Sequence, residues 1–183
     1  MSKLGIFMAD GCEEIEGLAV VDILRRAKVE IITISINGSN QVTGSHNITF
    51  TTDKKFEEVD FSTLQGIILP GGIPGTPNLK AHEGVLSTVK EFYDAHKIVA
   101  AICAAPTILG FAGLLKGKKA NCHPGFEEEL TGAECLTDKV VVDDNIITSR
   151  GMGTAVDFGL AILGMEQSKE EIELLKSKLV YEG

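Results

Sequence analysis

One stretch of this sequence combines a nucleophilic side chain with the local structure that could activate it. Residues 97–109 begin with a short apolar run that predicts a buried strand ending at Cys103. Small, helix-compatible residues follow, with Pro106 where the first helical turn tolerates a missing N–H. Strand, sharp turn with a nucleophile, and helix together make a nucleophile elbow. The helix N-terminus would favour a thiolate at Cys103, a nucleophile and an oxidation target, although a cysteine that merely fills the core remains the alternative.

A carboxyl group and a histidine could take part in chemistry at this thiol. Glu13, Glu14 and Glu16 open the helix that follows the first predicted strand. Acidic residues there usually balance the helix dipole, and we interpret Glu13 and Glu14 in this way. Glu16 begins the apolar part of the helix, so it could face the sheet, become protonated beside a thiol, and shuttle a proton. His123 could approach Cys103, although its position fits a structural role equally well.

Glycines could supply the backbone groups that such a site needs. Gly71 and Gly72 end another predicted strand and could bring N–H groups close to a ligand, whereas Pro-Gly-Gly alone fits a plain turn better. Sites in open α/β sheets form at the carboxyl ends of the strands. Four loops meet this rule and should converge on one site: residues 9–16, 70–75, 103–105 and 149–153.

The elements that would position these loops alternate between strand and helix. We predict strands at 4–8, 30–36, 66–69, 98–102, 118–121, 140–142 and 146–148, with a hairpin at 41–51. Helices are predicted at 13–27 and 84–95, from the elbow to about residue 113, and from the loop at 149–154 to about residue 163. A last helix should begin at a capping box formed by Ser168 and Glu171. This alternation predicts a single domain over residues 1–183, with a mostly parallel sheet covered on both faces.

The composition argues against several other classes of protein. A chain of 183 residues, 44% hydrophobic and 23% charged, suits one soluble domain with a full core. A net charge of −9 without a basic cluster argues against nucleic acid and anionic membranes as partners. We expect neither a signal peptide nor a membrane-spanning segment.

The cysteines suggest a reducing environment. Cys12, Cys103, Cys122 and Cys135 lack the paired spacing of disulfide or zinc sites. Cys122 and His123 could supply two metal ligands, but no second pair lies at a suitable interval, so we expect no metal and no cofactor. Free thiols in a chain without an export signal predict a cytoplasmic protein.

Several segments together resemble the ThiJ/PfpI superfamily, in its YajL and Parkinson disease protein 7 branch. Residues 100–106, Ala-Ala-Ile-Cys-Ala-Ala-Pro, resemble the elbow of that branch, and residues 10–16, Asp-Gly-Cys-Glu-Glu-Ile-Glu, resemble its first loop and helix. Residues 22–27, 69–72 and 149–154 match as well, so the resemblance covers essentially the whole chain in order.

This resemblance implies a flavodoxin-like three-layer sandwich that forms a homodimer. Cys103 would be the oxidation-sensitive nucleophile, Glu16 its protonated hydrogen-bond partner, and His123 the nearby histidine. The N–H groups of Gly72 and Ala104 would form the oxyanion site. The residues expected to bind the substrate or its oxyanion are Gly71, Gly72, Ala104 and Arg150.

Members of this branch are described as glutathione-independent glyoxalases, deglycases, redox sensors and chaperones. We expect a cysteine-dependent enzyme that converts small α-oxoaldehydes to hydroxy acids, with a non-enzymatic redox sensor or chaperone as the alternative. Ala104 stands where peptidase relatives have histidine, and the downstream His-x-Glu pair of glutamine amidotransferases is missing, which argues against both classes. Two residues depart from the branch: His46 replaces an arginine that reaches the partner's site, and Met152 replaces a common proline.

The first helix also predicts a homodimer on physical grounds. Residues 18–24, Leu-Ala-Val-Val-Asp-Ile-Leu, are apolar on nearly every side of a helix. One sheet cannot cover that much apolar surface, so we expect the second face of the helix to bind a second copy of the chain.

Overall fold

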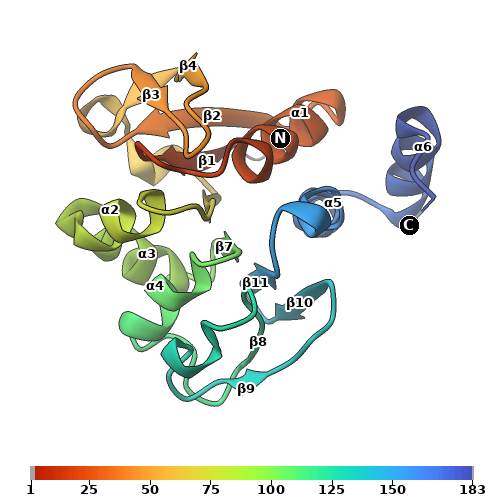
Figure 1. The fold of residues 1–183 in the computed structure, drawn as a ribbon. Helices are drawn as coiled ribbons and strands as arrows, with labels where there is room; N and C mark the ends of the chain where they lie inside the picture. The colour runs from red at the N-terminus through yellow and green to blue at the C-terminus, as the bar shows by residue number, and fades with distance from the viewer. Residues whose placement is uncertain (1–2, 183) are drawn as a thin grey trace.

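The computed structural model describes residues 3–182, which form a seven-stranded sheet with helices on both faces (Figure 1). The strand order is β10-β11-β7-β6-β1-β2-β5, and every neighbouring pair is parallel except β10 with β11. The strands are β1 Lys3–Met8, β2 Glu30–Ser35, β5 Lys54–Lys55, β6 Gly66–Leu69, β7 Ile98–Ile102, β10 Val140–Asp143 and β11 Ile146–Ser149. The predicted α/β fold with a mostly parallel sheet is confirmed.

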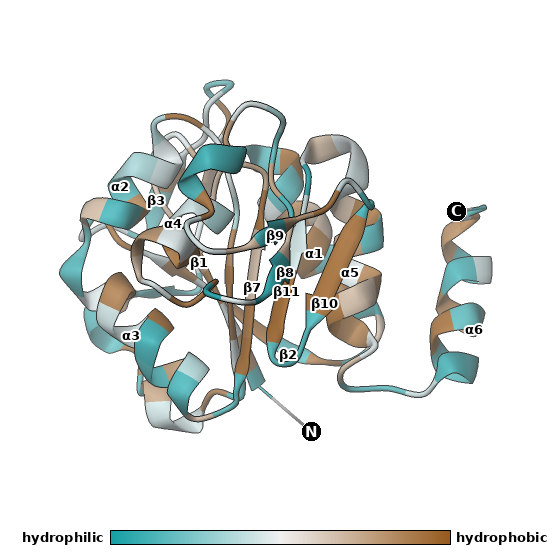
Figure 2. Cartoon of the chain, turned by 90° about the horizontal axis from the view of Figure 1, so that it is seen from below, coloured by the Kyte–Doolittle hydropathy of each residue, from teal (hydrophilic) through white to brown (hydrophobic). Residues whose placement is uncertain are grey.

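Two apolar layers cover the sheet because its central strands are hydrophobic on both sides (Figure 2). Leu4, Ile6 and Met8 face the layer that contains α1 (Glu14–Arg26) and α5 (Ala155–Leu163), which pack against each other. Phe7 faces the opposite layer, with α2 (Gly75–Ala81), α3 (Glu83–Asp94) and α4 (Pro106–Phe111). The C-terminal helix α6 (Lys169–Leu179) lies beyond α5 and begins with the predicted capping box (Figure 1).

Short elements complete the chain, and several of them, α2 included, were not predicted from the sequence. β3 (Gln41–Thr43) and β4 (Thr49–Thr51) form the predicted hairpin, and β8 (Lys119–Ala120) pairs with β9 (Glu134–Cys135). Helix α2 occupies residues for which we predicted a loop. It has seven residues, contains Pro77 and has no side-chain cap, so it carries no periodic signal; the burial of Thr76 and Leu79 holds it in place.

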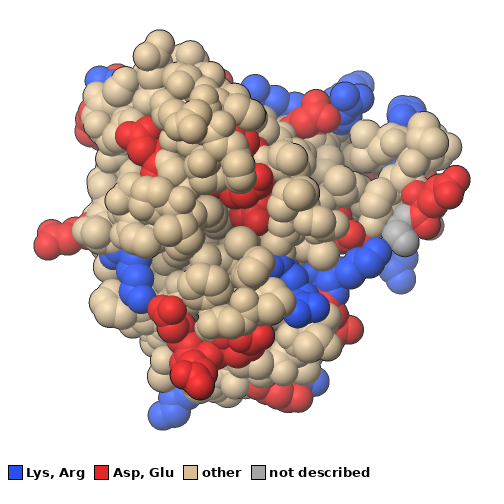
Figure 3. All heavy atoms as spheres, viewed as in Figure 1, with Lys and Arg blue, Asp and Glu red and all other residues tan. Residues whose placement is uncertain are grey.

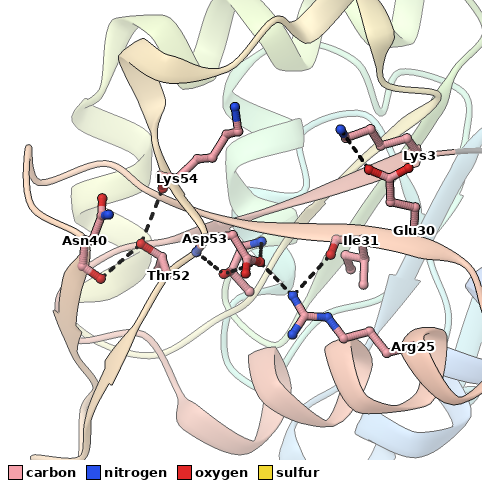
Figure 4. Close-up of polar contacts among 9 residues, drawn as sticks. Lys3, Arg25, Glu30, Ile31, Asn40, Thr52, Asp53 and Lys54 are labelled. Atoms are coloured by element: carbon pink, nitrogen blue, oxygen red, sulfur yellow. Dashed lines mark hydrogen bonds and ion pairs between the residues drawn. The ribbon is translucent and has the colours of Figure 1, made fainter.

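A polar network around Asp53 fastens α1 to one edge of the sheet (Figure 4). The Asp53 carboxylate accepts hydrogen bonds from the Thr33 N–H at 2.8 Å, the Thr33 hydroxyl at 2.9 Å and the Arg25 guanidinium at 2.7 Å. Burial opposes ionisation of Asp53, but these donors outweigh it and lower its pKa. The network joins the end of α1 to β2 and to the segment before β5, so α1 is anchored at the end opposite Glu16.

Charged side chains are unevenly distributed on the face seen in Figure 1. Lys and Arg lie mostly toward the margins of this face, while acidic side chains gather in several groups (Figure 3). One short band of basic side chains lies on the right of this face, between the main body and α6 (Figure 3). None of the helices in residues 3–182 is long and apolar enough to cross a membrane.

Candidate active site

The strand, turn and helix predicted around Cys103 are present, and the turn is sharp. β7 ends at Ile102, Cys103 has φ of 66°, and α4 begins at Pro106. A residue with a side chain rarely adopts this left-handed conformation, so the neighbouring chain must hold it. The Cys103 N–H donates to Ser149 O at 2.9 Å, and Cys103 O accepts from the His123 N–H at 2.8 Å. These bonds fix the elbow between two other loops.

Two backbone N–H groups are directed at the Cys103 sulfur. Gly72 and Ala104 both donate hydrogen bonds to it and thereby lower the pKa of the thiol. Gly72 has φ of 94°, and a Cβ atom there would lie 2.3 Å from Glu13 N and 2.6 Å from Gly11 O. Only glycine can therefore bring this N–H group to the sulfur.

Glu16 lies beside the thiol in a nearly dry environment. Its side chain is 1% exposed, Oε2 accepts the Gly71 N–H at 2.9 Å, and the carboxyl group hydrogen bonds with the Cys103 side chain. A Cβ atom on Gly71 would lie 2.6 Å from Cys103 Cβ and 2.7 Å from Glu16 Oε2, so this close packing also requires glycine. Burial raises the pKa of Glu16 to about 7, against the lowering effect of its hydrogen bonds.

The thiol itself is less acidic than the sequence suggested. Burial and the Glu16 carboxylate raise the pKa of Cys103 to about 12, and the Gly72 and Ala104 N–H groups offset only part of this. The prediction that the helix N-terminus makes Cys103 a thiolate at neutral pH, and the most acidic cysteine, is therefore wrong. α4 has only six residues and begins three residues after the sulfur-bearing position, whereas burial and Glu16 act on the sulfur directly.

The distinctive property of Cys103 is its shared proton with Glu16. Burial also raises the pKa of Cys12 and of Cys122 to about 12, so a high thiol pKa does not distinguish Cys103. Between about pH 7 and pH 12 the Glu16–Cys103 pair holds one proton, which either group can carry. Neither Cys12 nor Cys122 has a carboxyl partner of this kind among its hydrogen bonds in residues 3–182.

His123 and Arg150 lie at the mouth of the site rather than on the sulfur. The His123 ring is exposed, its Nδ1 lies 3.0 Å from Pro124 O, and it makes no hydrogen bond to Cys103 or Glu16 in the described chain. It contributes to the elbow through its backbone. Arg150 is half-buried and, within residues 3–182, makes no hydrogen bond or ion pair. Both side chains line an open pocket of about 360 Å³ with Gly151, Met152, Gly153 and Thr154.

The acidic residues of the first helical turn have two different roles. Glu13 is the helix N-cap, since its carboxylate accepts the Glu16 N–H at 2.7 Å, in agreement with our interpretation. Glu14 differs from it, because its side chain is 4% exposed and points to the hairpin loop. It accepts the His46 N–H at 2.8 Å and the Ile48 N–H at 3.4 Å. Glu14 lies in the first turn of α1, as our interpretation required, but it also holds the β3–β4 loop on α1.

One group of side chains in residues 3–182 has ligand atoms close enough together for a metal ion. Glu13, Glu14 and His46 each place one such atom within 4.8 Å of the others. The Glu14 oxygens already accept hydrogen bonds from the hairpin, and Glu13 already caps the helix. This group therefore stabilises the hairpin, and it does not include Cys103.

The four predicted loops meet at the carboxyl edge of the sheet. Gly71 lies against Cys103 and Glu16, and a Cβ atom on Gly151 would lie 3.8 Å from Glu16 Oε1 and 3.4 Å from His123 Cδ2. Gly151 lies in one of the four predicted loops, but nothing in the sequence around it indicates a role. Its importance arises from its position over the carboxyl group, which no local sequence signal indicates.

Comparison with known proteins identifies the fold family. The model of the DJ-1/PfpI family matches residues 2–165. The chain belongs to this family. It is 33% identical to the glutathione-independent glyoxalase DJ-1 of Schizosaccharomyces pombe, over 98% of each chain. The structure of oxidized Toxoplasma gondii DJ-1 superimposes with a TM-score of 0.95 at 30% identity over the full length of both chains. The predicted resemblance and the flavodoxin-like fold are thus confirmed.

Some relatives are longer than this chain. The chain is 35% identical to protein DJ-1 homolog B of Arabidopsis thaliana over 94% of its own length, but this match spans only 40% of that relative. For homolog A of the same plant the identity is 37% and the share of the relative is 45%. The chain therefore spans less than half the length of these two relatives.

Proposed function

We propose that this protein is a glutathione-independent glyoxalase that converts a small α-oxoaldehyde, such as methylglyoxal, to the hydroxy acid. The observation that carries the proposal is the Cys103 sulfur, which receives two backbone N–H groups and hydrogen bonds with a buried carboxyl whose pKa is about 7. A relative with 33% identity over 98% of each chain bears the name glutathione-independent glyoxalase.

The first step forms a carbon–sulfur bond. Above about pH 7 the Glu16 carboxylate takes the thiol proton as sulfur attacks the aldehyde carbon, and the carbonyl electrons move to oxygen. The N–H groups of Gly72 and Ala104 already point toward the sulfur, so they lie next to the developing oxyanion. Donors of this kind contribute on the order of 3 kcal/mol each in related sites. Protonation of the oxyanion gives a hemithioacetal.

The second step moves a hydrogen between the two substrate carbons. Glu16 removes the proton from the former aldehyde carbon and returns one to the former ketone carbon, which converts the hemithioacetal to a thioester. The first carbon is oxidised and the second is reduced, so no external oxidant is required. Water then cleaves the thioester, releasing lactate from methylglyoxal or glycolate from glyoxal. The same attack on an amine or thiol adduct of the aldehyde would appear as deglycation.

Lactate formation from methylglyoxal, without glutathione, tests the proposal. We expect Cys103→Ser to remove the activity, while Cys135→Ser, at an exposed cysteine outside the site, retains it. If the wild-type protein forms no lactate, or if Cys103→Ser forms as much as wild type, the protein is not this enzyme.

Redox sensing is the second candidate, because the same hydrogen-bond donors could bind oxygen atoms added to the sulfur. Two equivalents of peroxide would convert the thiolate to a sulfinate and release two waters, with protonated Glu16 donating to one added oxygen. Mass mapping after limited peroxide treatment should find Cys103 modified first. Earlier modification of exposed Cys135, or of Cys12 or Cys122, would exclude this role.

We further propose that the protein is a homodimer, but the apolar surface that supports this differs from the one that the sequence indicated. α5 of the same chain covers much of the second face of α1, which we had assigned to a partner. Ile15 and Leu18 remain 51% and 36% exposed, and Ile48, whose N–H bonds to Glu14, is 55% exposed at the same end of α1. Sedimentation should give a dimer that Ile15→Glu weakens. A wild-type monomer at micromolar concentration would rule the dimer out.

A further inference from the structure

A chain of hydrogen bonds runs through the loop that follows β11. The Gly151 N–H donates to Thr154 Oγ1 at 3.2 Å, Thr154 Oγ1 lies 2.7 Å from Ser149 Oγ, and Ser149 Oγ donates to Lys139 O at 2.7 Å. Ser149 Oγ donates its one hydrogen to Lys139 O, and the Thr154 hydroxyl has two acceptors within reach, Ser149 Oγ at 2.7 Å and Gly151 O at 2.9 Å. Thr154 Oγ1 accepts the Gly151 N–H in either case, so Thr154 is the central link.

Both ends of this chain touch the candidate active site. Ser149 is fully buried, and its carbonyl accepts the Cys103 N–H at 2.9 Å, which helps to hold the left-handed elbow. Gly151 is buried as well, and a Cβ atom added to it would lie 3.8 Å from Glu16 Oε1. Thr154 thus connects the residue beneath the nucleophile with the residue that covers its carboxyl partner.

We propose that Thr154 is a positioning residue of this site: its hydroxyl holds Gly151 over Glu16 and thereby keeps water away from that carboxyl group. Water would otherwise enter from the open pocket that Gly151, Met152 and Thr154 line. Glu16 faces three other titratable groups: Cys103 from the elbow, Glu13 from its own helix, and His123 across Gly151. The proposal concerns the reactivity of Cys103 and holds whether or not the protein is a glyoxalase.

The consequence is a dependence of thiol reactivity on pH that Thr154 controls. Burial is the main cause of the raised pKa of Glu16, so a hydrated Glu16 should titrate closer to its ordinary value of 4.5. Cys103 becomes reactive when Glu16 loses its proton, because the pair can then form the thiolate. Loosening the loop should therefore shift the rise of reactivity to lower pH.

The test is the pH dependence of Cys103 alkylation by iodoacetamide, followed by peptide mass spectrometry. Thr154→Val keeps the volume and removes the three hydrogen-bond contacts of the hydroxyl, whereas the bond from the Thr154 N–H to Gly151 O at 2.8 Å remains. We expect its midpoint about one pH unit below that of wild type. Thr154→Ser keeps the hydroxyl and should restore the wild-type midpoint. Thr88→Val is the matched control, because it removes a buried hydroxyl bond to Gly84 O on α3, far from the site, and should leave the midpoint in place.

Each outcome decides the proposal. It is overturned if folded Thr154→Val has the wild-type midpoint, if Thr154→Ser shifts as far as Thr154→Val, or if Glu16→Gln leaves the wild-type midpoint intact. Should Thr154→Val fail to fold, Ser149→Ala removes the next link and retains the backbone bond to Cys103, and it must shift the midpoint in the same direction. Alkylation needs no turnover, so failure of this proposal is distinct from failure to form lactate.

Discussion

Two buried carboxyl groups stand two residues apart in the first turn of α1, and their surroundings drive their pKa values in opposite directions. Glu14 is 4% exposed and Glu16 is 1% exposed. The hairpin loop lowers the pKa of Glu14, whereas burial raises the pKa of Glu16 to about 7. The same residue type, on the same helical turn, thus holds a loop at one position and, in the proposed mechanism, transfers a proton at the other.

Burial raises the pKa of both carboxyl groups, and the number of hydrogen-bond donors decides whether that effect is overcome. Glu14 accepts the backbone N–H groups of His46 and Ile48 and contacts the Ser45 hydroxyl and the His46 ring, so its charge is well solvated by the protein. Glu16 has one backbone donor, from Gly71, and a weakly acidic thiol. A buried carboxylate with few donors binds its proton more tightly, and this makes Glu16 suitable as an acid and base near neutral pH.

The largest expected effect is on chemistry. Glu16→Gln should lower the rate of lactate formation above pH 7 by about 100-fold or more, because no base remains to move protons on and off the substrate. The Glu16-dependent midpoint should also vanish. Steady-state kinetics and alkylation rates across the neutral range measure both. Glu14→Gln is the matched control, and an equal loss there would show that the two carboxylates are not functionally different.

Stability should reveal the same contrast through its pH dependence. The pKa of Glu16 is about 7 in the folded state against 4.5 when unfolded, so the folded state binds more protons between these values. Stability conferred by protonated Glu16 should therefore fall by roughly 3 kcal/mol as the pH rises from 4.5 to 7. Glu14 has a lowered pKa, so its stabilising contribution is present above 4.5 and is lost as the pH falls further.

Urea unfolding of wild type, Glu16→Gln and Glu14→Gln over this range separates the two contributions. The wild type should lose stability relative to Glu16→Gln between pH 4.5 and 7, and relative to Glu14→Gln below 4.5. A constant difference between wild type and Glu16→Gln would show that Glu16 is hydrated in the folded protein.

Removal of the Glu14 side chain should have a moderate effect, on stability alone. Glu14→Ala leaves the N–H groups of His46 and Ile48 without their acceptor, and we expect a loss of about 2 kcal/mol in urea unfolding. The pH midpoint of Cys103 alkylation should not change. A shifted midpoint would mean that the hairpin loop and the thiol site are coupled.

The smallest effect is expected at His46. Its side chain is 71% exposed, so its ion pair with Glu14 should contribute less than about 1 kcal/mol, and the backbone bond survives in His46→Ala. Unfolding free energies near neutral pH measure this. A loss as large as that of Glu14→Ala would assign the hairpin anchor to the imidazole ring instead.

The sequence alone was sufficient for the main elements and for the place of the site. Apolar runs predicted the strands, Ser168 and Glu171 predicted the start of α6, and Pro106 marked the start of the elbow helix. These signals are local, because hydrophobic period, capping and backbone restriction depend on residues a few positions apart. The carboxyl-edge rule then placed four loops together, since it follows from the connectivity of a parallel sheet.

Only the tertiary structure decided what each of those loops does. Glu14 and His46 are 32 positions apart and Glu16 and Gly71 are 55 apart, so the sequence could not show which carboxyl receives donors. The same limit applies to the exposed ring of His123, to α5 against α1, and to Thr154 in contact with Ser149. The helical period predicts that a side chain is buried. Its proton affinity depends on how far it is shielded from water and on the hydrogen-bond donors around it, and distant segments of the chain determine both.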